Sequence, residues 1–388
     1  MPPRARWRLT KPLRSRIRAG HPWVFDRALA PPRDVAAGDI VTLVDEDGPV
    51  ATALADPASP IRARILDVPD AAIDGRWAEA RARSAAARRA RDPLLVGCTG
   101  IRLVHGEGDA CPGLVVDQYA DTAVVVFDGD AAAAFWRPLL SDVVAGLARG
   151  GADLRHVWVR GSRRDKSGAF AVVGDPPAEI VISEDDARFA VDVRAGQKTG
   201  FFLDQRDNRR TIRRHAAGAS VLNVFAYTGG FSLHAALGGA TRVTSVDIAA
   251  PAIAGLVANV QRSGLPVAGH EPVSIDAFEF FTRAQAQHRR WDLVIVDPPS
   301  FAPSERAKPA ALSAYRKLCV AALAVVAAGG RFALASCSSH VTEADLLDLV
   351  GGLGILRLRG SAGAASDHPV LPAFPEGRYL KFLFFDVD

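Results

Sequence analysis

The sequence predicts an α/β protein whose C-terminal half forms a doubly wound, mostly parallel β-sheet. Five short apolar runs recur after residue 219, and helical segments separate or follow them. This alternation is typical of parallel sheets covered by helices on both faces. The first 70 residues instead hold short β-like runs separated by turn residues, which predicts a small β-barrel or sandwich.

Composition agrees with a folded protein of two or three domains. The chain has 388 residues, of which 49% are hydrophobic, enough for sizeable cores. No apolar run approaches the ~20 residues of a membrane helix, and the basic N-terminus lacks the apolar core of a secretory signal. We therefore expect a cytoplasmic protein with no membrane partner. The four cysteines show no CxxC spacing, so we expect neither a metal site nor a redox pair.

The formal net charge is only +4, but basic residues are concentrated near the start. Arg14, Arg16 and Arg18 alternate, which places them on one face if the segment is a strand. A basic face of this kind permits a polyanion partner but does not demand one. The barrel is predicted over residues 1–73.

An α+β unit is predicted next, over residues 74–186. Residues 76–92 are rich in Ala and Arg and predict a helix. Strand-like runs within 101–127 precede a helical segment over 131–148 and a further strand over 156–161. The parallel sheet then occupies residues 187–388, and its last strand, in GRYLKFLFFDVD (377–388), is expected to be antiparallel.

The ends of the predicted parallel strands carry groups suited to a nucleotide-like ligand, which binds at the carboxyl edge of such sheets. The first strand leads into a turn with Gly229 and Gly230, where the backbone can approach a ligand closely. The second ends at Asp247, which is suited to ribose hydroxyls, and the third at Asp276, which is suited to an adenine amino group. The fourth ends in DPPSF, residues 297–301. Each acid alone is more often a strand-end or cap residue, but four consecutive ends favour a binding edge.

The loop FAYTGGF (225–231) does not match GxGxxG, so a dinucleotide-binding oxidoreductase is disfavoured. A cofactor without a pyrophosphate fits better, and S-adenosylmethionine is the obvious choice.

Several motifs resemble one family. LNVFAYTGGFSL, SVDIA, DLVIVDPPSF and SCSS look like the cofactor and catalytic motifs of class I S-adenosylmethionine-dependent methyltransferases. The segment GQKTGFFLDQRDNR (196–209) resembles a hallmark of the ribosomal RNA large-subunit cytosine-5 methyltransferases. RAGHPWVF (18–25) is similar to that family's PUA domain, and residues 105–121 are similar to its central domain.

The resemblance implies a PUA-like barrel, a central α+β domain and a Rossmann-like methyltransferase domain, acting on large-subunit ribosomal RNA. Members of this family commonly form homodimers. The cofactor-binding residues that the motifs imply are Gln197, Lys198, Thr199, Phe201, Asn223, Phe225, Tyr227, Thr228, Gly229, Asp247, Ile248, Asp276, Ala277 and Asp297. The predicted substrate-binding residues, besides the three arginines, are Pro298, Pro299, Ser300 and Phe301. Asp204, Arg206 and Asn208 are expected to hold the 196–209 segment together.

Cys337 and Asp297 are the predicted catalytic residues. Carbon-5 of cytosine is a poor nucleophile, and a thiolate that adds to carbon-6 activates it. A lone cysteine at a strand end is more often a core residue, but Cys337 follows the fifth strand within the recognised SCS motif. Many RNA cytosine-5 methyltransferases carry a second cysteine for product release, and Ser300 occupies the comparable position here.

Two alternatives remain open from the sequence. A guanine-nitrogen methyltransferase of the same fold, forming m7G or m2G, needs no thiol. A non-catalytic RNA-binding factor for ribosome assembly would carry only a vestigial cofactor site.

Overall fold

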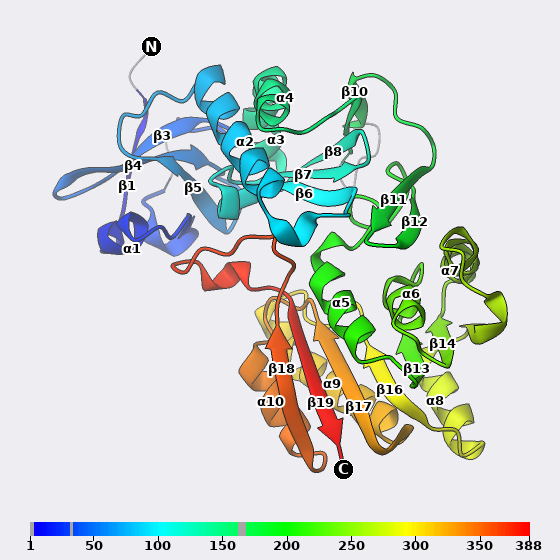
Figure 1. Ribbon diagram of the computed structural model, residues 1–388. Helices are drawn as coiled ribbons and strands as arrows, with labels where there is room; N and C mark the ends of the chain where they lie inside the picture. The colour runs from blue at the N-terminus through cyan, green and yellow to red at the C-terminus, as the bar shows by residue number, and fades with distance from the viewer. Residues whose placement is uncertain (1–3, 32–33, 162–167) are drawn as a thin grey trace. The chain divides into compact units, whose positions relative to one another are not determined.

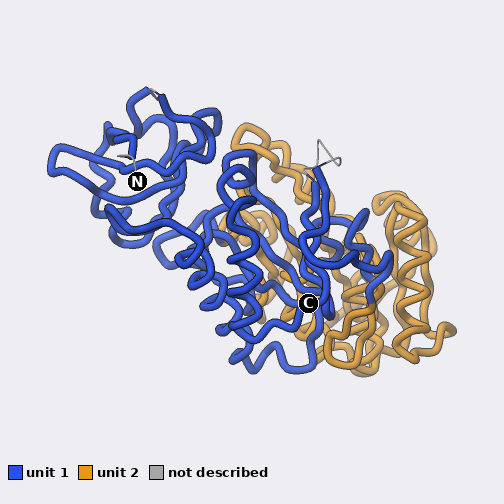
Figure 2. Tube along the Cα trace, turned by 90° about the horizontal axis from the view of Figure 1, so that it is seen from above, with its two compact units in different colours: residues 1–180, 191–201, 366–377 blue, residues 181–190, 202–365, 378–388 orange. Residues whose placement is uncertain are grey.

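The computed structural model describes residues 4–31, 34–161 and 168–388, and its Cα positions divide into two compact units (Figures 1 and 2). Unit 1 comprises residues 1–180, 191–201 and 366–377, and unit 2 comprises residues 181–190, 202–365 and 378–388. Each unit therefore draws on segments far apart in the chain. The three predicted domain ranges stay predictions.

The N-terminal part of unit 1 is a closed five-stranded barrel, as predicted. Its strands run in the order β1-β3-β4-β5-β2, and the edge strands continue into Leu9 and Leu29, which form an antiparallel bridge. The bridge closes the sheet, and Trp7, Val24 and Leu43 fill its interior. The strands are β1 (Arg6–Arg8), β2 (Trp23–Phe25), β3 (Ile40–Asp45), β4 (Gly48–Ala55) and β5 (Ile61–Asp67).

The segment with the three alternating arginines is a helix, α1 (Arg14–Arg18), and not a strand. The reason is the spacing of Leu13 and Ile17, four residues apart, which lets both pack on the barrel core from one helical face. Arg14 and Arg18 thus share a face that Arg16 does not. The Arg14 guanidinium bonds Asp45 Oδ2 at 2.9 Å and two backbone carbonyls, whereas the other two side chains are exposed.

The second sheet of unit 1 has the order β10-β9-β8-β7-β6. β8 and β9 are parallel, which requires a crossover, and the helices α3 and α4 supply it. Trp136 and Leu140 from these helices lie in the core with Ala82 of α2. The elements are α2 (Gly75–Ala90), β6 (Gly100–His105), β7 (Leu114–Tyr119), β8 (Thr122–Phe127), α3 (Asp130–Trp136), α4 (Leu140–Arg149), β9 (His156–Val159) and β10 (Phe170–Val173).

The helical stretch Asp130–Arg149 is long and apolar enough, by length and composition alone, to cross a membrane. It carries Arg137 and Asp142 within it, and 44% of its most apolar window is buried inside the protein. Its Phe135 and Val143 belong to the core cluster of unit 1. The stretch therefore has the burial pattern of a core helix.

Unit 2 is built on a seven-stranded sheet of order β15-β14-β13-β16-β17-β19-β18 (Figure 1). The first five strands in this order are parallel, and β19 is antiparallel to both of its neighbours, as predicted for the C-terminal strand. The strands are β13 (Ser220–Val224), β14 (Arg242–Asp247), β15 (His270–Ser274), β16 (Trp291–Val296), β17 (Val326–Ser336), β18 (Leu356–Ala362) and β19 (Lys381–Val387).

Helices cover both faces of this sheet because the strand residues alternate in direction. Val221 and Leu293 pack with α5 and α6, whereas Leu222 and Val294 pack with α8, α9 and α10. The helices are α5 (Arg206–Arg214), α6 (Gly230–Leu237), α7 (Ala250–Arg262), α8 (Ala277–Ala286), α9 (Lys308–Leu323) and α10 (Glu343–Gly351). The hairpin of β11 (Ile180–Glu184) and β12 (Ala187–Val191) precedes them.

A buried ion pair ties this hairpin to α5. Arg209 Nε donates to Glu184 Oε1 at 2.7 Å, and its NH2 group donates to the other carboxylate oxygen. His234 Nε2 of α6 lies 2.9 Å from Glu184 Oε1. Burial alone raises the pKa of the Glu184 carboxyl, but the Arg209 charge and hydrogen bonds outweigh it and hold the pKa far below the ordinary 4.5.

We predict that Glu184→Gln lowers the free energy of unfolding by about 3–5 kcal/mol at pH 7, because it leaves a buried guanidinium without its counter-charge. Urea denaturation measures this value. Because the pKa of Glu184 is lowered in the folded state, its carboxylate contributes its full share to the free energy of unfolding above about pH 4.5. Below that value this contribution decreases, and the stability difference between wild type and Glu184→Gln becomes smaller.

Asp186→Asn is the matched control, because its pair with Arg213 lies at the surface. We expect it to cost less than about 1 kcal/mol. Equal effects of the two substitutions would contradict the role given to the buried pair.

Candidate active site

Hydrogen-bond register brings the ends of the parallel strands to one edge of the sheet. Val224 of β13 pairs with Val246 on one side and with Val296 on the other. Phe225, Asp247 and Asp297 each directly follow one of these paired residues, so the three lie side by side at the carboxyl edge of the sheet. From β13 the chain adds β14 and β15 on one side of the sheet and then β16 and β17 on the other. Ligands bind in such sheets at the point where the strand order switches sides, here between β13 and β16.

The loop after β13 is held in an unusual backbone conformation. Phe225, Tyr227 and Gly229 have φ values of 64°, 47° and 90°. The Asp247 carboxylate holds the loop, since Oδ2 accepts from the Tyr227 backbone N–H at 2.8 Å and Oδ1 from that of Ala249 at 2.9 Å. The predicted ribose acceptor, Asp247, is thus bonded directly to the predicted cofactor loop.

Gly229 is required here for reasons that differ from the expectation. Its positive φ favours glycine, and a Cβ at this position would lie 2.7 Å from Leu256 Cγ and 2.9 Å from Leu233 Cδ1. A Cβ on Gly230 would meet Arg209 Cδ at 3.0 Å. Packing against neighbouring side chains therefore already requires both positions to lack a Cβ.

The polar and apolar groups of this edge fit an adenosine-bearing cofactor. Ile248, directly after Asp247, is 72% exposed, and Phe278, beside Asp276 and Ala277, is 42% exposed. Exposed apolar side chains next to carboxylates suit a purine ring and a ribose diol. Thr228 Oγ1 is a buried hydroxyl with no hydrogen-bond partner among the described residues, as a ligand-facing group would be.

Two other predicted cofactor residues make internal contacts. Asp276 Oδ1 caps α8, accepting from the backbone N–H groups of Phe278 and Glu279. Asn223 is buried, and its Nδ2 donates to Ser232 Oγ at 2.9 Å. Both contacts preserve the strand-to-helix turns of this edge.

The predicted cofactor residues Gln197, Lys198, Thr199 and Phe201 belong to unit 1. Thr199 is buried there, where its hydroxyl donates to Asp117 and lies 2.7 Å from the Tyr119 hydroxyl. The Phe201 backbone N–H also reaches the Tyr119 hydroxyl, at 3.2 Å. Unit 1 therefore anchors this segment through β7.

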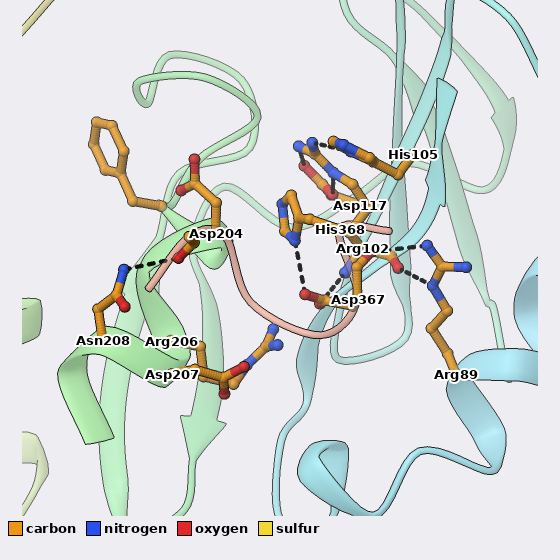
Figure 3. Close-up of polar contacts among 12 residues, drawn as sticks. Arg89, Arg102, His105, Asp117, Asp204, Arg206, Asp207, Asn208, Asp367 and His368 are labelled. Carbon is orange, nitrogen blue, oxygen red and sulfur yellow. Dashed lines mark hydrogen bonds and ion pairs between the residues drawn. The ribbon is translucent and has the colours of Figure 1, made fainter. Parts of the chain in front are cut away.

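Asp117 itself belongs to a buried charged network of unit 1 (Figure 3). Arg102 donates to both Asp117 oxygens, at 2.7 and 2.9 Å, and lies 3.1 Å from His105 Nδ1. Its backbone N–H donates to Asp367 Oδ2 at 2.8 Å. The anchor of the 196–201 segment is thereby fixed by several charge-assisted bonds.

Asp297 is oriented by a buried amide that sequence reasoning missed. Gln205 Nε2 donates to Asp297 Oδ2 at 3.0 Å, and Asn208 Nδ2 donates to Gln205 Oε1 at 2.6 Å. Asn208 also reaches the carbonyl of Gly363, and Tyr379 donates to Asp204, so these two residues hold the segment together as expected. Figure 3 shows Asp204 and Asn208 at the start of α5.

Cys337 lies half-buried, one residue beyond the end of β17, in a turn rich in hydroxyl groups. Tyr315 of α9 donates to Ser336 Oγ at 2.8 Å and lies 3.2 Å from Ser338 Oγ. Ser300 Oγ lies 3.2 Å from Ser338 Oγ, which connects the DPPSF loop to the same turn. Pro298 is buried, whereas Pro299 and Ser300 are exposed and Phe301 is half-buried.

Lys381 is a second residue of this region that the sequence did not reveal. Its Nζ donates to the carbonyls of Ser338 at 2.6 Å and Tyr379 at 2.9 Å, and it is 5% exposed. Burial lowers the pKa of its ammonium group to about 8, while the charges of Cys337 and Asp345 raise it. Burial also raises the pKa of the Tyr315 hydroxyl, so that group stays neutral.

Comparison with known proteins gives two family matches. A model described as S-adenosylmethionine-dependent methyltransferase matches residues 102–348, and one described as PUA-like domain matches residues 8–67. Among curated relatives, a ribosomal RNA large subunit methyltransferase of Deinococcus radiodurans is 36% identical and covers 100% of this chain and 98% of its own. Ribosomal RNA large subunit methyltransferase I of Aeromonas salmonicida is 32% identical over 94% of each chain.

Solved structures show the same fold. A putative S-adenosylmethionine-dependent methyltransferase from Streptococcus mutans has a TM-score of 0.86 at 23% identity, over 99% of this chain and 100% of its own. A putative methyltransferase complexed with SAH has a TM-score of 0.87 with the same identity and coverage. These matches agree with the doubly wound sheet preceded by a PUA-like barrel.

We predict that Tyr315→Phe lowers the free energy of unfolding by about 1 kcal/mol, because two buried serine hydroxyls lose a hydrogen-bond partner. A double-mutant cycle with Ser336→Ala, measured by urea denaturation, should give a coupling energy of about 1 kcal/mol. Additive effects of the two substitutions would show that the hydroxyl network does not support the turn.

Proposed function

Because this chain belongs to the family of S-adenosylmethionine-dependent methyltransferases, we propose that it forms 5-methylcytosine in large-subunit ribosomal RNA through a covalent Cys337 adduct. The cofactor is S-adenosylmethionine. The relatives named as ribosomal RNA large subunit methyltransferases, which match nearly the whole chain, support the choice of RNA. Such a substrate implies a cytoplasmic protein.

One observation carries the choice of cytosine: a half-buried thiol stands at the carboxyl edge of the sheet, beside the strand that ends at Asp297. β16 and β17 are neighbours, and Val296 pairs with Leu334. Cys337 and Asp297 therefore follow adjacent strands at the edge where ligands bind in such sheets. A guanine-nitrogen methyltransferase has no use for this thiol.

In the proposed reaction, the Cys337 thiolate adds to carbon-6 of the base, and the electron pair of the C5=C6 bond moves to carbon-5. Carbon-5 then forms a bond to the methyl group that S-adenosylmethionine would supply as an electrophile, and the electron pair of the broken S–CH3 bond would stay on the cofactor sulfur. A water molecule removes the carbon-5 proton, the C–H pair restores the double bond, and the C6–S bond breaks to return the thiolate.

Asp297 stabilises the charge that develops on the base during the addition. Its carboxylate is suited to accept from the cytosine amino group and to share a proton with ring nitrogen-3. The bond from Gln205 fixes one carboxylate oxygen and leaves the group oriented before substrate arrives. Pro298, Pro299, Ser300 and Phe301 continue this loop and are the proposed walls of the base site.

The proposed cofactor residues divide into two sets. Phe225, Tyr227, Thr228 and Gly229 would hold the amino-acid part. Asp247 and Ile248, with Asp276 and Ala277, would hold the adenosine. Arg16 and Arg18 on the barrel are exposed and suited to RNA phosphates, which position the substrate without specifying its sequence.

We predict that Cys337→Ala lowers the methylation rate by on the order of a thousandfold or more, because the covalent route is lost. Labelled cofactor and unmodified large-subunit ribosomal RNA, digested to nucleosides and analysed by mass, measure the product. Wild type should also form a stable adduct with RNA that contains 5-fluorocytosine.

Cys319→Ala is the matched control, since it removes a buried thiol of the same unit from α9. We expect it to keep its activity. Full activity of Cys337→Ala would rule out the covalent route, and a methylated guanine would rule out cytosine as the target.

We also predict that Asp247→Ala weakens S-adenosylmethionine binding about 10- to 100-fold, as expected for loss of charged hydrogen bonds to a ligand. Isothermal titration calorimetry measures the change. Asp292→Asn, at the opposite end of the sheet where Asp292 accepts from Ser220, should bind normally. A wild-type protein that does not bind the cofactor would favour a non-catalytic assembly factor.

A further inference from the structure

Lys381 is brought to the Cys337 turn by the pairing of the last strand. In the antiparallel register of β17 and β19, Lys381 stands opposite Ser336, the residue before Cys337. Its Nζ donates to the carbonyl of Ser338, the residue after Cys337, at 2.6 Å. The ammonium is thus bonded to the residue that directly follows Cys337.

Burying this ammonium is costly unless a negative charge faces it. Within unit 2, as far as the structure describes it, Lys381 forms no ion pair with a carboxylate, and its bonded partners are two neutral carbonyls. The negative groups whose charges act on it are Cys337 and Asp345. Both groups favour the charged form of Lys381, against the effect of burial.

Asp345 is already compensated. Lys308 Nζ lies 2.8 Å from Asp345 Oδ2, and the same oxygen accepts from Thr342 in the capping box of α10. Cys337 is therefore the second group whose negative charge Lys381 is placed to stabilise.

Three other charged or titratable groups that the structure describes around the turn differ from Lys381. Tyr315 is neutral, and Asp297, at the end of β16, is negative and opposes a second negative charge nearby. His340 Nδ1 lies 3.1 Å from Glu305 Oε2, so its ring contacts an acid of its own. Among the described groups named here, Lys381 is a buried cation whose charge favours ionisation of the thiol.

We propose that Lys381 is a positioning residue that holds Cys337 as a thiolate and orients it for attack. The inference rests on the proposed covalent role of Cys337 and deepens it. Lys381 transfers no proton in these steps. It stabilises the thiolate before the addition to carbon-6, and again when the C6–S bond breaks and its electron pair returns to sulfur.

The same charge bears on product release. A leaving group departs faster when its anion is stabilised, as it is for thiols of lower pKa. With Ser300 in the position of a second cysteine, the Lys381 charge makes Cys337 a better leaving group without a second thiol.

Thiol alkylation tests the charge pairing without RNA or cofactor. The full chain is treated with iodoacetamide from pH 5 to 10 and then cut with trypsin, which releases Cys337 alone in peptide 332–357. Mass spectrometry of that peptide gives the pH midpoint of its reactivity. Cys319 is buried, and burial raises its pKa to about 12, so it serves as an unreactive internal reference.

We predict that Lys381→Gln raises the Cys337 midpoint by about one pH unit or more, with about tenfold less alkylation at pH values below both midpoints. Lys381→Arg should restore most of the wild-type profile because it keeps the charge. Lys317→Gln removes an exposed lysine of α9 and should change nothing. If the Gln variant does not fold, Lys381→Met replaces it in the same series.

Methylation kinetics give a second readout. Lys381→Gln should lower kcat more than it changes KM for RNA and should move the pH optimum upward. An unchanged Cys337 midpoint in a folded Lys381→Gln or Lys381→Met variant would overturn the inference, as would an equal shift in Lys317→Gln. Full methylation by Cys337→Ala would instead refute the covalent function while leaving the measured charge pairing in place.

Discussion

The parallel register of four strands is the constraint on which the rest of the site depends. Val224 is paired on both sides, with Val246 and Val296, and Val296 is paired in turn with Leu334. Backbone hydrogen bonds alone thus deliver four strand ends to one edge. The candidate groups lie at those ends or within a few residues, so their separation is set by the sheet and is insensitive to the surface side chains.

Around this edge, the buried polar side chains of unit 2 form small hydrogen-bonded networks. Gln205 links Asn208 to Asp297, Tyr315 links two serines, and Lys381 spans the turn of Cys337. Each buried polar group costs free energy unless it is bonded, and most of the groups named here are. Hydrogen-bonded networks of this kind hold side chains in one orientation before a ligand arrives, which is the condition for efficient catalysis.

The chemistry proposed for the turn needs a thiol that is a good nucleophile and later a good leaving group. An adjacent buried ammonium serves both needs, because it stabilises the anion on either side of the adduct. Cys319 shows the opposite environment in the same unit: it lies in an apolar helix, where burial raises its pKa to about 12. The two cysteines of this unit thus lie in different surroundings: Cys319 is buried in the helix core and Cys337 is half-buried beside Lys381.

The sequence by itself determined the five parallel strands, the residues at their carboxyl ends and the antiparallel last strand, because alternation and strand-end residues are local signals and a family resemblance reinforced them. It did not reveal β18, a mostly exposed edge strand without a buried apolar run. The alternation of the three arginines suggested one face of a strand, but Arg14–Arg18 is a helix. The four-residue spacing of Leu13 and Ile17 was the signal for it. Only the tertiary structure decided that Gln205 reaches Asp297, 92 residues away, and that Lys381 reaches Ser338, 43 residues away. Such contacts depend on which strands become neighbours in the sheet, and no local periodicity records that choice.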